Sequence, residues 1–475
     1  MSGAPFDADG LRAAGRDLAV PFQVQLADGR LLQMQRLLRL LPGKRIAGEA
    51  SLEGRRVFAK LFVAKAGERH WLAECKGVGA LAAAGIPTPE VLLADRLRGG
   101  GHLIVSSYVE EAESLAADWA RLDAPPAGDP GALDVLAPVL AMLAQMHRAG
   151  LAQRDLHLGN FLRSRDRLLV IDGDSVTVAA APLPALAAAE NLGVLLAQLP
   201  AAWDGAAPAL LAEYQSAGGI ASVDAAMLCA SIEKVRAWRL QDYLKKSLRD
   251  CTLFSVARST NRFVAVLRTE RERLADMLAV PDKAIDTGLP LKSGNTCTVA
   301  QVALPGGDIV VKRYNLKSVG HALSRLWRPS RAWHSWREGH RLALYGIATP
   351  APLALVEERF GPLRRRAWLF AEHCPGVSLS RHLSPESPPP AAEALALTTL
   401  FGLLCHLRIT HGDMKASNLL WHAGRIWLID LDACTQHRSE AAWRKAWRRD
   451  RARLLRNWPA DSGLVAWLDR ALPPA

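Results

Sequence analysis

Two distant segments of the chain follow the same pattern of polar residues, and this repetition constrains the fold more than any other sequence feature. In each segment an aspartate is followed five residues later by an asparagine, and seventeen residues later by a second aspartate. The two sets are Asp155, Asn160 and Asp172, and Asp413, Asn418 and Asp430. One such triple can arise by chance, but two triples with the same spacing in matching contexts indicate a duplicated domain.

The sequence upstream of each triple repeats as well. An apolar strand ends in a lysine, a helical stretch with a glutamate follows, and the helix stops at a glycine before a Thr-Pro step. A glycine at this place suits a helix C-terminus, and proline prevents continuation. The residues concerned are Lys60, Glu74 and Gly85 in the first copy, and Lys312, Glu338 and Gly346 in the second.

A chain of 475 residues is long enough for two or three domains. We expect an α+β fold in which each copy has an N-terminal antiparallel sheet with one helix above a mostly helical lobe. Residues 185–280 are predicted to be helical, and the 45 residues after Asp430 predict an abbreviated second helical lobe. The predicted domains are 1–283, with lobes 25–108 and 109–283, and 284–475, with lobes 284–373 and 374–475.

The repeated residue types suit phosphoryl transfer from a nucleotide, which needs an immobilised polyphosphate, magnesium and a base for the attacking hydroxyl. A lysine held by a glutamate would bind the phosphates, and carboxylate and amide oxygens would bind Mg²⁺. A loop aspartate would accept the hydroxyl proton. The predicted residues are Lys60, Glu74, Lys312 and Glu338 for the nucleotide, Asn160, Asp172, Asn418 and Asp430 for the metal, and Asp155 and Asp413 for catalysis.

Two further sequence features lie near the same sites. Asp174 and Asp432, two residues beyond the metal aspartates, are candidates for metal or loop binding or for solvated strand ends. Residues 42–45 and 292–296 are candidates for hairpins that cover the phosphates, and plain turns explain them equally well.

At these residues the chain resembles the protein-kinase-like superfamily. His411-Gly412-Asp413 and the metal motifs at 171–174 and 429–432 are similar to the small-molecule and sugar kinase branch. The segment 155–160, together with a Glu74 helix that ends in Gly-Ile-Pro-Thr-Pro, resembles the bacterial lipopolysaccharide kinases. Gln153 stands where that family usually has histidine, a side chain that mainly supports the loop.

The resemblance implies two tandem kinase-like domains that use ATP and Mg²⁺. The implied acceptor is a heptose or Kdo hydroxyl of the lipopolysaccharide inner core, on a lipid anchor at the cytoplasmic face of the inner membrane. Two other functions stay open. Lys415 occupies the place of a phosphate-contacting lysine of Ser/Thr protein kinases, which suits a kinase for protein or a soluble small molecule. A non-catalytic scaffold for lipopolysaccharide assembly is the third.

Positive charge is concentrated in the C-terminal part of the chain. The net charge is +12, and residues 284–475 carry 26 Lys and Arg against 15 Asp and Glu. Residues 325–341 and 443–458 combine tryptophan with arginine, which predicts contact with an anionic membrane surface. The alternative is that the tryptophans enter a core while the arginines stay solvated. Nucleic acid is not an expected partner, because no recognised binding motif accompanies the charge.

The remaining sequence features predict a cytoplasmic protein, and the resemblance together with the basic stretches implies that it associates peripherally with the inner membrane. The N-terminus has no basic stretch followed by an apolar run, and no 18-residue window is free of charge and proline. We therefore expect neither a leader peptide nor a spanning helix. The seven cysteines are scattered and form no Cys-x-x-Cys pair, which favours a reducing compartment.

Overall fold

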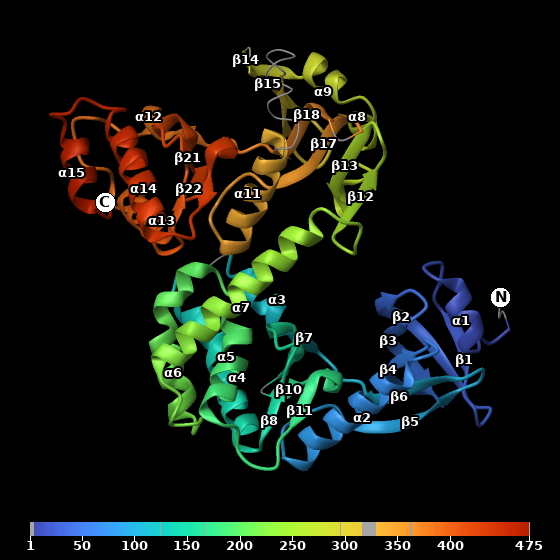
Figure 1. Ribbon diagram of the computed structural model, residues 1–475. Coiled ribbons are helices and arrows are strands. Elements are labelled where there is room, and N and C mark those ends of the chain that lie inside the picture. The colour runs from blue at the N-terminus through green and yellow to red at the C-terminus, as the bar shows by residue number, and fades with distance from the viewer. Residues whose placement is uncertain are drawn as a thin grey trace. The chain divides into compact units, whose positions relative to one another are not determined.

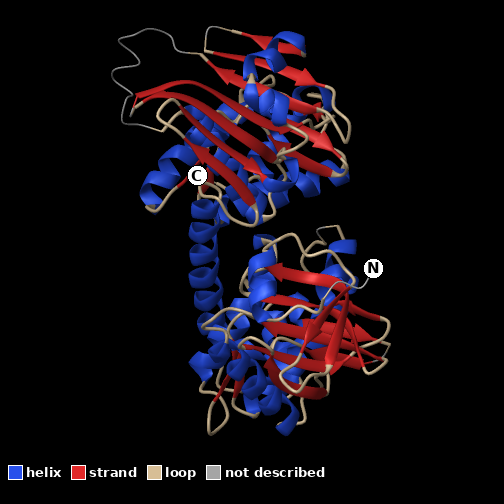
Figure 2. Ribbon diagram, turned by 90° about the vertical axis from the view of Figure 1, so that its right-hand side faces the viewer, coloured by secondary structure: helices blue, strands red, loops and turns tan. Residues whose placement is uncertain are grey.

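The computed structural model describes residues 4–123, 125–165, 167–294, 296–315, 329–361 and 363–474. The chain divides into two compact units (Figure 1). The N-terminal unit comprises Met1–Leu199 and Trp203–Arg236, and the C-terminal unit comprises Pro200–Ala202 and Ala237–Ala475. Figure 2 shows that each unit combines strands and helices, so the predicted mixed fold class is confirmed.

The N-terminal unit begins with an antiparallel sheet in the strand order β1-β2-β3-β4-β6-β5. The elements of this lobe are α1 (Ala8–Ala14), β1 (Phe22–Gln25), β2 (Leu31–Leu41), β3 (Arg45–Leu52), β4 (Arg55–Phe62), α2 (Glu68–Ala83), β5 (Val91–Leu97) and β6 (Gly101–Ser107). Val57, Ala59 and Leu61 of β4 are buried in one core with α1. Because successive strand residues point to opposite faces, Lys60 lies on the other face.

The second lobe of the N-terminal unit is mostly helical, and its core is built on one face of α4, where Leu136, Val139, Leu140 and Leu143 recur at helical spacing. Its elements are β7 (Ala112–Ser114), α3 (Leu115–Arg121), α4 (Pro130–Arg148), β8 (Leu151–Gln153), η1 (Leu158–Asn160), β9 (Phe161–Ser164), β10 (Arg167–Val170), η2 (Gly173–Ser175), β11 (Val176–Val178), α5 (Ala185–Leu196), η3 (Ala201–Ala206), α6 (Ala207–Ser216) and α7 (Ala225–Lys246). The division between the units falls inside α7, and the first two residues of η3 also belong to the C-terminal unit.

A buried polar network supports the loop that follows β8. Nε2 of the fully buried His147 lies 3.1 Å from Asn191 Oδ1, and Nδ1 lies 3.0 Å from the Tyr214 hydroxyl. The Asn191 amide in turn donates to the backbone carbonyl of Gln153 at 2.8 Å. Burial lowers the pKa of His147 to about 4, although its bond to Asn191 opposes the shift. The imidazole is therefore neutral at pH 7 in the folded unit.

We expect the native chain to lose stability as the pH falls from about 6.5 to about 4. In this range His147 binds a proton in the unfolded state but not in the folded state. Once the pH is below both pKa values, the free energy of unfolding has fallen by about 3 kcal/mol. Urea unfolding at several pH values should show a shallower pH dependence for His147→Gln than for the native chain. Parallel curves for the two proteins would contradict this assignment.

The C-terminal unit begins with an antiparallel sheet in the order β12-β13-β17-β18-β16-β15-β14. The elements of this lobe are β12 (Phe254–Arg258), β13 (Arg262–Leu267), η4 (Arg268–Glu270), α8 (Ala275–Ala279), α9 (Pro281–Thr287), β14 (Leu289–Ser293), β15 (Cys297–Val302), β16 (Ile309–Tyr314), α11 (Arg331–Tyr345), β17 (Pro352–Phe360) and β18 (Leu363–Glu372). Ile309 and Val311 of β16 share a core with α8 and α9. Lys312 therefore lies on the face that α11 covers.

The helical lobe of the C-terminal unit (red in Figure 1) follows the sheet. Its elements are β19 (Val377–Ser378), α12 (Leu379–His382), α13 (Ala391–His406), β20 (Ile409–Thr410), η5 (Ala416–Asn418), β21 (Leu419–His422), β22 (Arg425–Leu428), η6 (Leu431–Ala433), β23 (Thr435–Gln436), α14 (Glu440–Leu455) and α15 (Gly463–Ala471). Its core includes Phe401 of α13, Trp447 of α14 and Leu468 of α15. After η6, the described part of this lobe contains the helices α14 and α15.

The predicted boundary at 283 is wrong, because the units divide between Arg236 and Ala237. Residues 263–278, which were predicted to be helical, contain β13, η4 and α8 instead. β13 pairs with β12 and β17 and so belongs to the C-terminal sheet. Phe263 packs in the core of α11, whereas Val266 packs in the core of α8 and α9. A strand buried on both faces has no polar alternation, and its sequence is ambiguous between strand and helix.

The tryptophans of the two basic stretches lie mainly in cores. Trp336 and Trp447 are fully buried, and Trp458 is 8% exposed. These three side chains are therefore not membrane anchors, and the core alternative is confirmed for them. Residues 325–328 of the first stretch lie outside the described residues.

Candidate active site

The structure brings Lys60, Glu74 and Asp172 together in the N-terminal unit. Lys60 Nζ lies 2.5 Å from Glu74 Oε1 and 2.5 Å from Asp172 Oδ1. Burial alone would lower the pKa of Lys60, but the two carboxylates outweigh it and raise this pKa. The lysine is therefore held as a cation between a helix of the sheet lobe and the helical lobe.

Asp172 follows β10 and adopts a left-handed backbone with φ of 66°, and Asp430 follows β22 with φ of 60°. This conformation is costly for residues other than glycine, and such strain is concentrated at functional sites. The Gln153 amide donates to the carbonyls of Ile171 and Asp172, each at 2.8 Å, and His411 Nε2 lies 2.8 Å from the Ile429 carbonyl. Gln153 thus supports the aspartate segment as the histidine does in the C-terminal unit.

Lys312 and Asp430 also meet, but Glu338 does not join them. Lys312 Nζ lies 2.5 Å from Asp430 Oδ1 and 2.9 Å from Asp432 Oδ2. Glu338 instead pairs with Arg341, one turn later on α11, at 2.8 Å. The predicted pairing of Glu338 with Lys312 is therefore wrong. The carboxylate binds the residue three positions later on its own helix, where side chains are neighbours.

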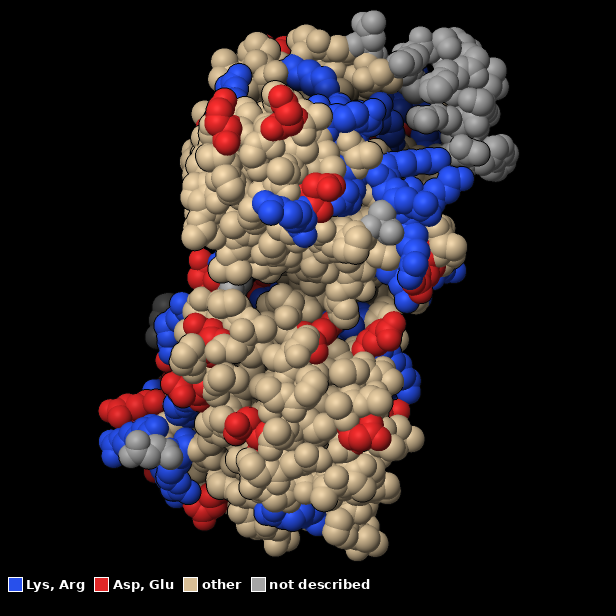
Figure 3. All heavy atoms as spheres, turned by 90° about the vertical axis from the view of Figure 1, so that its left-hand side faces the viewer, with Lys and Arg blue, Asp and Glu red and all other residues tan. Residues whose placement is uncertain are grey.

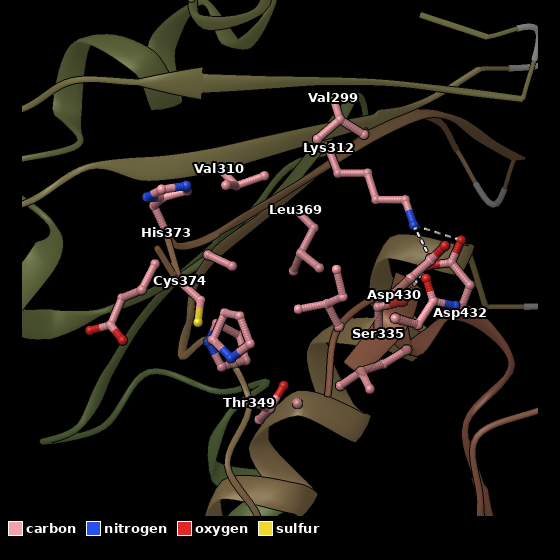
Figure 4. Close-up of a pocket in the computed structure, with 18 of the residues that line it drawn as sticks. Val299, Val310, Lys312, Ser335, Thr349, Leu369, His373, Cys374, Asp430 and Asp432 are labelled. Carbon is pink, nitrogen blue, oxygen red and sulfur yellow. Dashed lines mark hydrogen bonds and ion pairs between the residues drawn. The ribbon is translucent and has the colours of Figure 1, made fainter. Parts of the chain in front are cut away.

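Each Lys and Asp pair lies in a cleft lined by apolar side chains. The cleft of the C-terminal unit has a volume of about 350 Å³ (Figure 4), and that of the N-terminal unit about 330 Å³. Val299, Val310 and Leu369 line the former cleft from the sheet, and Leu420 lines it from the helical lobe. An apolar cleft with a cation and a carboxylate at one end suits a ligand with a flat apolar part and a charged part.

The predicted catalytic aspartates differ in their surroundings. Asp155 is exposed, and its carboxylate has no ion pair among the described residues. Asp413 Oδ1 lies 2.5 Å from Arg453 Nη2 of α14, and Asp413 Oδ2 lies 3.0 Å from Lys415 Nζ. Both aspartates follow the short strands β8 and β20, so they have comparable places in the two lobes.

The predicted asparagines lie next to the predicted metal aspartates. The backbone N–H of Ile171 donates to the Asn160 carbonyl at 2.9 Å, and that of Ile429 donates to the Asn418 carbonyl at 3.0 Å. Asn418 Nδ2 donates to the Asp413 carbonyl at 2.9 Å. This bond uses the amide nitrogen, so the acceptor atom of the Asn418 side chain is Oδ1. Asn160 Oδ1 accepts from the His157 N–H at 3.0 Å and keeps a second lone pair.

The oxygen donors present fit magnesium that is shared with phosphate. Within the described residues, no group of three or more His, Cys, Asp or Glu side chains forms a metal cage. Mg²⁺ usually binds one or two carboxylates together with substrate phosphates and water, and it does not need such a cage. Asp172 with Asn160, and Asp430 with Asn418, are the residues that would hold it.

Residues of the two predicted hairpins line the clefts, namely Arg45 in the N-terminal unit and Lys292 in the C-terminal unit. Residues 42–44 turn from β2 into β3, and Arg45 at the start of β3 pairs with Asp174 at 2.7 Å. In the C-terminal unit the turn follows β14, and Asn295 lies outside the described residues. Arg45 belongs to the predicted hairpin at 42–45, but its ion pair with Asp174 was not predicted from the sequence.

The contacts of Asp432 were also missed. Its carboxylate accepts from the Tyr314 hydroxyl at 2.6 Å, the Ser335 hydroxyl at 2.8 Å and Arg331 at 2.6 Å. Burial opposes its ionisation, but Lys312 and the bond from Tyr314 outweigh burial and lower the pKa of Asp432 to about 2. The signal in the sequence was the repeated Asp-x-Asp spacing, which does not reveal the partners.

Comparison with known proteins identifies the family of this chain. A sequence model of the lipopolysaccharide kinase (Kdo/WaaP) family matches residues 54–178 and 294–464, which is more than half of the chain. The chain belongs to the lipopolysaccharide kinase (Kdo/WaaP) family. The two matched ranges contain both sets of Lys, Asp, Asn and Asp residues. Membership supports a phosphotransferase that uses ATP.

The chain is also similar to solved structures of kinases. One is WaaP in complex with acyl carrier protein, with 22% identity and a TM-score of 0.33 over 43% of this chain and 89% of that chain. Another is vaccinia related kinase 3, with 13% identity and a TM-score of 0.30 over 50% of this chain and 96% of that chain. Comparison with curated proteins gave no match.

Proposed function

We propose that the chain is an ATP-dependent kinase that phosphorylates a sugar hydroxyl, heptose or Kdo, of the lipopolysaccharide inner core. The observation that carries this proposal is the contact of a largely buried lysine with a strand-end aspartate, at 2.5 Å, at the end of an apolar cleft in each unit. Family membership supports the lipopolysaccharide core as the acceptor.

We further propose that the two units are tandem kinase-like domains. Both contain a sheet with a lysine strand, a helix that ends at a left-handed glycine, and a loop that bears Asp and Asn. The family match supports this reading, since each of its two ranges, 54–178 and 294–464, contains one set of Lys, Asp, Asn and Asp residues. Both domains would then bind nucleotide.

Each residue set has a defined part in the proposed transfer. Mg²⁺, when bound, neutralises charge on the nucleotide phosphates. Lys60 and Lys312 hold the phosphates, and the acceptor hydroxyl attacks the terminal phosphorus as the bond to the ADP oxygen breaks. Asp155 or Asp413 accepts the hydroxyl proton, and its position fixes the direction of attack.

A transfer assay with competing acceptors tests this function. The purified full chain is incubated with labelled ATP and Mg²⁺ and with lipopolysaccharide core, casein, or free heptose and Kdo. We expect label in the core and not in casein or the free sugars. Label in casein or free sugar instead would overturn the proposed acceptor, and no transfer to any of them would favour the scaffold.

We propose a location at the cytoplasmic face of the inner membrane, where this acceptor is made. None of the described helices has the length and apolar character needed to cross a bilayer. Many Lys and Arg side chains lie on the face of the C-terminal unit seen in Figure 3. Helix α14 has three exposed basic residues, Lys445, Arg448 and Arg449, that could pair with anionic headgroups. This attachment does not need the buried tryptophans.

Vesicle sedimentation tests this attachment. The chain is expected to sediment with vesicles of phosphatidylcholine and phosphatidylglycerol, less so in high salt, because screening weakens surface charge. Arg448→Glu with Arg449→Glu should reduce binding about tenfold or more, since each basic residue contributes about 1 kcal/mol. The matched control reverses the exposed Lys65 and Arg69 of the N-terminal unit. Equal binding to pure phosphatidylcholine would contradict the proposal.

A further inference from the structure

The lysines of the two units have different second partners. In the N-terminal unit the second carboxylate comes from a helix, because Glu74 of α2 contacts Lys60 at 2.5 Å. In the C-terminal unit it comes from the aspartate segment itself, because Asp432 contacts Lys312 at 2.9 Å. Figure 4 shows Lys312 between Asp430 and Asp432 at the end of the cleft.

The helix caps define which residue of α11 matches Glu74. Glu74 precedes Gly85 by eleven residues, and Gly85 has a φ of 70° just after α2. Gly346, with a φ of 79°, caps α11, and the residue eleven positions earlier is Ser335. Ser335 lines the cleft, whereas Glu338 pairs with Arg341. The C-terminal unit therefore has a hydroxyl where the N-terminal unit has a carboxylate.

This hydroxyl is hydrogen-bonded to Asp432. The Ser335 hydroxyl donates to Asp432 Oδ1 at 2.8 Å, and Tyr314 donates to the same oxygen at 2.6 Å. Arg331 at the start of α11 binds Oδ2 at 2.6 Å. Both oxygens of Asp432 are thus held by α11 and β16, and Oδ2 also faces Lys312.

The matching aspartate of the N-terminal unit has a different contact. Asp174 pairs with Arg45 of the hairpin at 2.7 Å, and its backbone N–H donates to Glu74 Oε2 at 3.0 Å. Lys60 pairs with Glu74 and Asp172. The second aspartate of the Asp-x-Asp motif therefore contacts the hairpin arginine in the N-terminal unit and the strand lysine in the C-terminal unit.

We infer that Asp432 replaces the helix glutamate in the C-terminal unit and is the positioning residue for the phosphate-binding Lys312. This inference rests on the proposed function, because it assigns how the second nucleotide site holds its lysine. Helix α11 acts on the lysine through Ser335 and Arg331, which orient Asp432, and not through a carboxylate of its own.

The experiment uses the full chain with Asp172→Asn, so that the activity measured comes from the C-terminal unit. In this background Asp432→Asn is expected to lower the kcat/KM for ATP by about 10- to 100-fold, the range for a lost hydrogen bond to a charged group. Most of the loss should be in kcat, because Lys312 remains to attract the phosphates. Glu338→Gln is the matched control and should keep the KM and kcat for ATP.

Rescue separates positioning from structural support. Ser335→Glu places a carboxylate at the helix position that Glu74 occupies in the N-terminal unit, and it should recover at least tenfold of the kcat lost in Asp432→Asn. Thermal unfolding of each variant reports stability separately. A variant that loses stability without rescue of kcat would show a purely structural role and overturn the inference.

The failure of the inference differs from that of the proposed function. If the native chain neither binds ATP nor transfers phosphate, the proposed function fails. A different set of results would show that the assignment of Asp432 is wrong while the kinase function stands. In that case the Asp172→Asn chain transfers phosphate, the added Asp432→Asn substitution leaves kcat unchanged, and the added Glu338→Gln substitution abolishes transfer.

Discussion

Replacing Asp155 and Asp413 together with alanine is expected to remove phosphate transfer to the lipopolysaccharide core. A positioned base contributes about 10²- to 10⁴-fold to such a reaction, so each single variant should lose this factor in the unit that carries it. The measurement is the mass of the core oligosaccharide from a deletion strain that expresses each variant. The double variant should lack every phosphate that the native chain adds.

The exposed Asp134 and Asp461 provide matched controls, since neither lies in a cleft or on a predicted catalytic loop. Alanine at these positions should leave the core mass unchanged. A native core mass in the double variant would refute the enzymatic role of both loops. Loss of phosphate in one single variant but not the other would identify the unit that acts on the core.

Gly77→Ala is expected to disrupt the nucleotide site of the N-terminal unit. A Cβ atom at this position would lie 1.9 Å from the Gly173 carbonyl oxygen and 2.6 Å from its carbon. Both contacts are with backbone, so α2 must move and carry Glu74 away from Lys60. Overpacking of this kind costs about 1–3 kcal/mol or more, and we expect nucleotide binding by this unit to be lost with it.

Gly79→Ala is the control on the same helix, because a Cβ atom there meets no heavy atom within 4 Å. Alanine favours helix over glycine by up to about 1 kcal/mol, so this variant should be more stable. Denaturant unfolding and ATP-dependent stabilisation of both variants test the pair. A neutral effect of Gly77→Ala would contradict the close packing of α2 on the aspartate segment.

The sequence predicts the meeting of each lysine with its strand-end aspartate because both lie on elements with clear signals. Lys60 and Lys312 end apolar strands, and the equal spacing to Asp172 and Asp430 repeats a whole domain pattern. The structure places both pairs at 2.5 Å. The chemical roles of these residues stay predictions until binding and transfer are measured.

The partners of Glu338 and Asp432 were not predictable in the same way. A glutamate three residues beyond the position that matches Glu74 lies nearly one turn further along the helix, and the count from Gly346 reveals this displacement only when the cap is used as the reference. Asp432 is fixed by three side chains that are distant in sequence, Tyr314, Arg331 and Ser335. Local patterns cannot specify such contacts.

The domain boundary was misplaced for a different reason. β13 is buried on both faces, against α11 through Phe263 and against α8 and α9 through Val266. Its apolar run lacks the alternation that distinguishes a strand from a buried helix. The tryptophans of α11 and α14 show a related limit, since composition alone does not separate a core position from a membrane contact.

Calorimetric titration with a non-hydrolysable ATP analogue and Mg²⁺ tests most directly whether each lysine and aspartate pair forms a nucleotide site. We expect two molecules bound per native chain, one in Asp172→Asn or Asp430→Asn, and none in the double variant. No binding to the native chain, or a stoichiometry that these substitutions leave unchanged, would contradict this expectation.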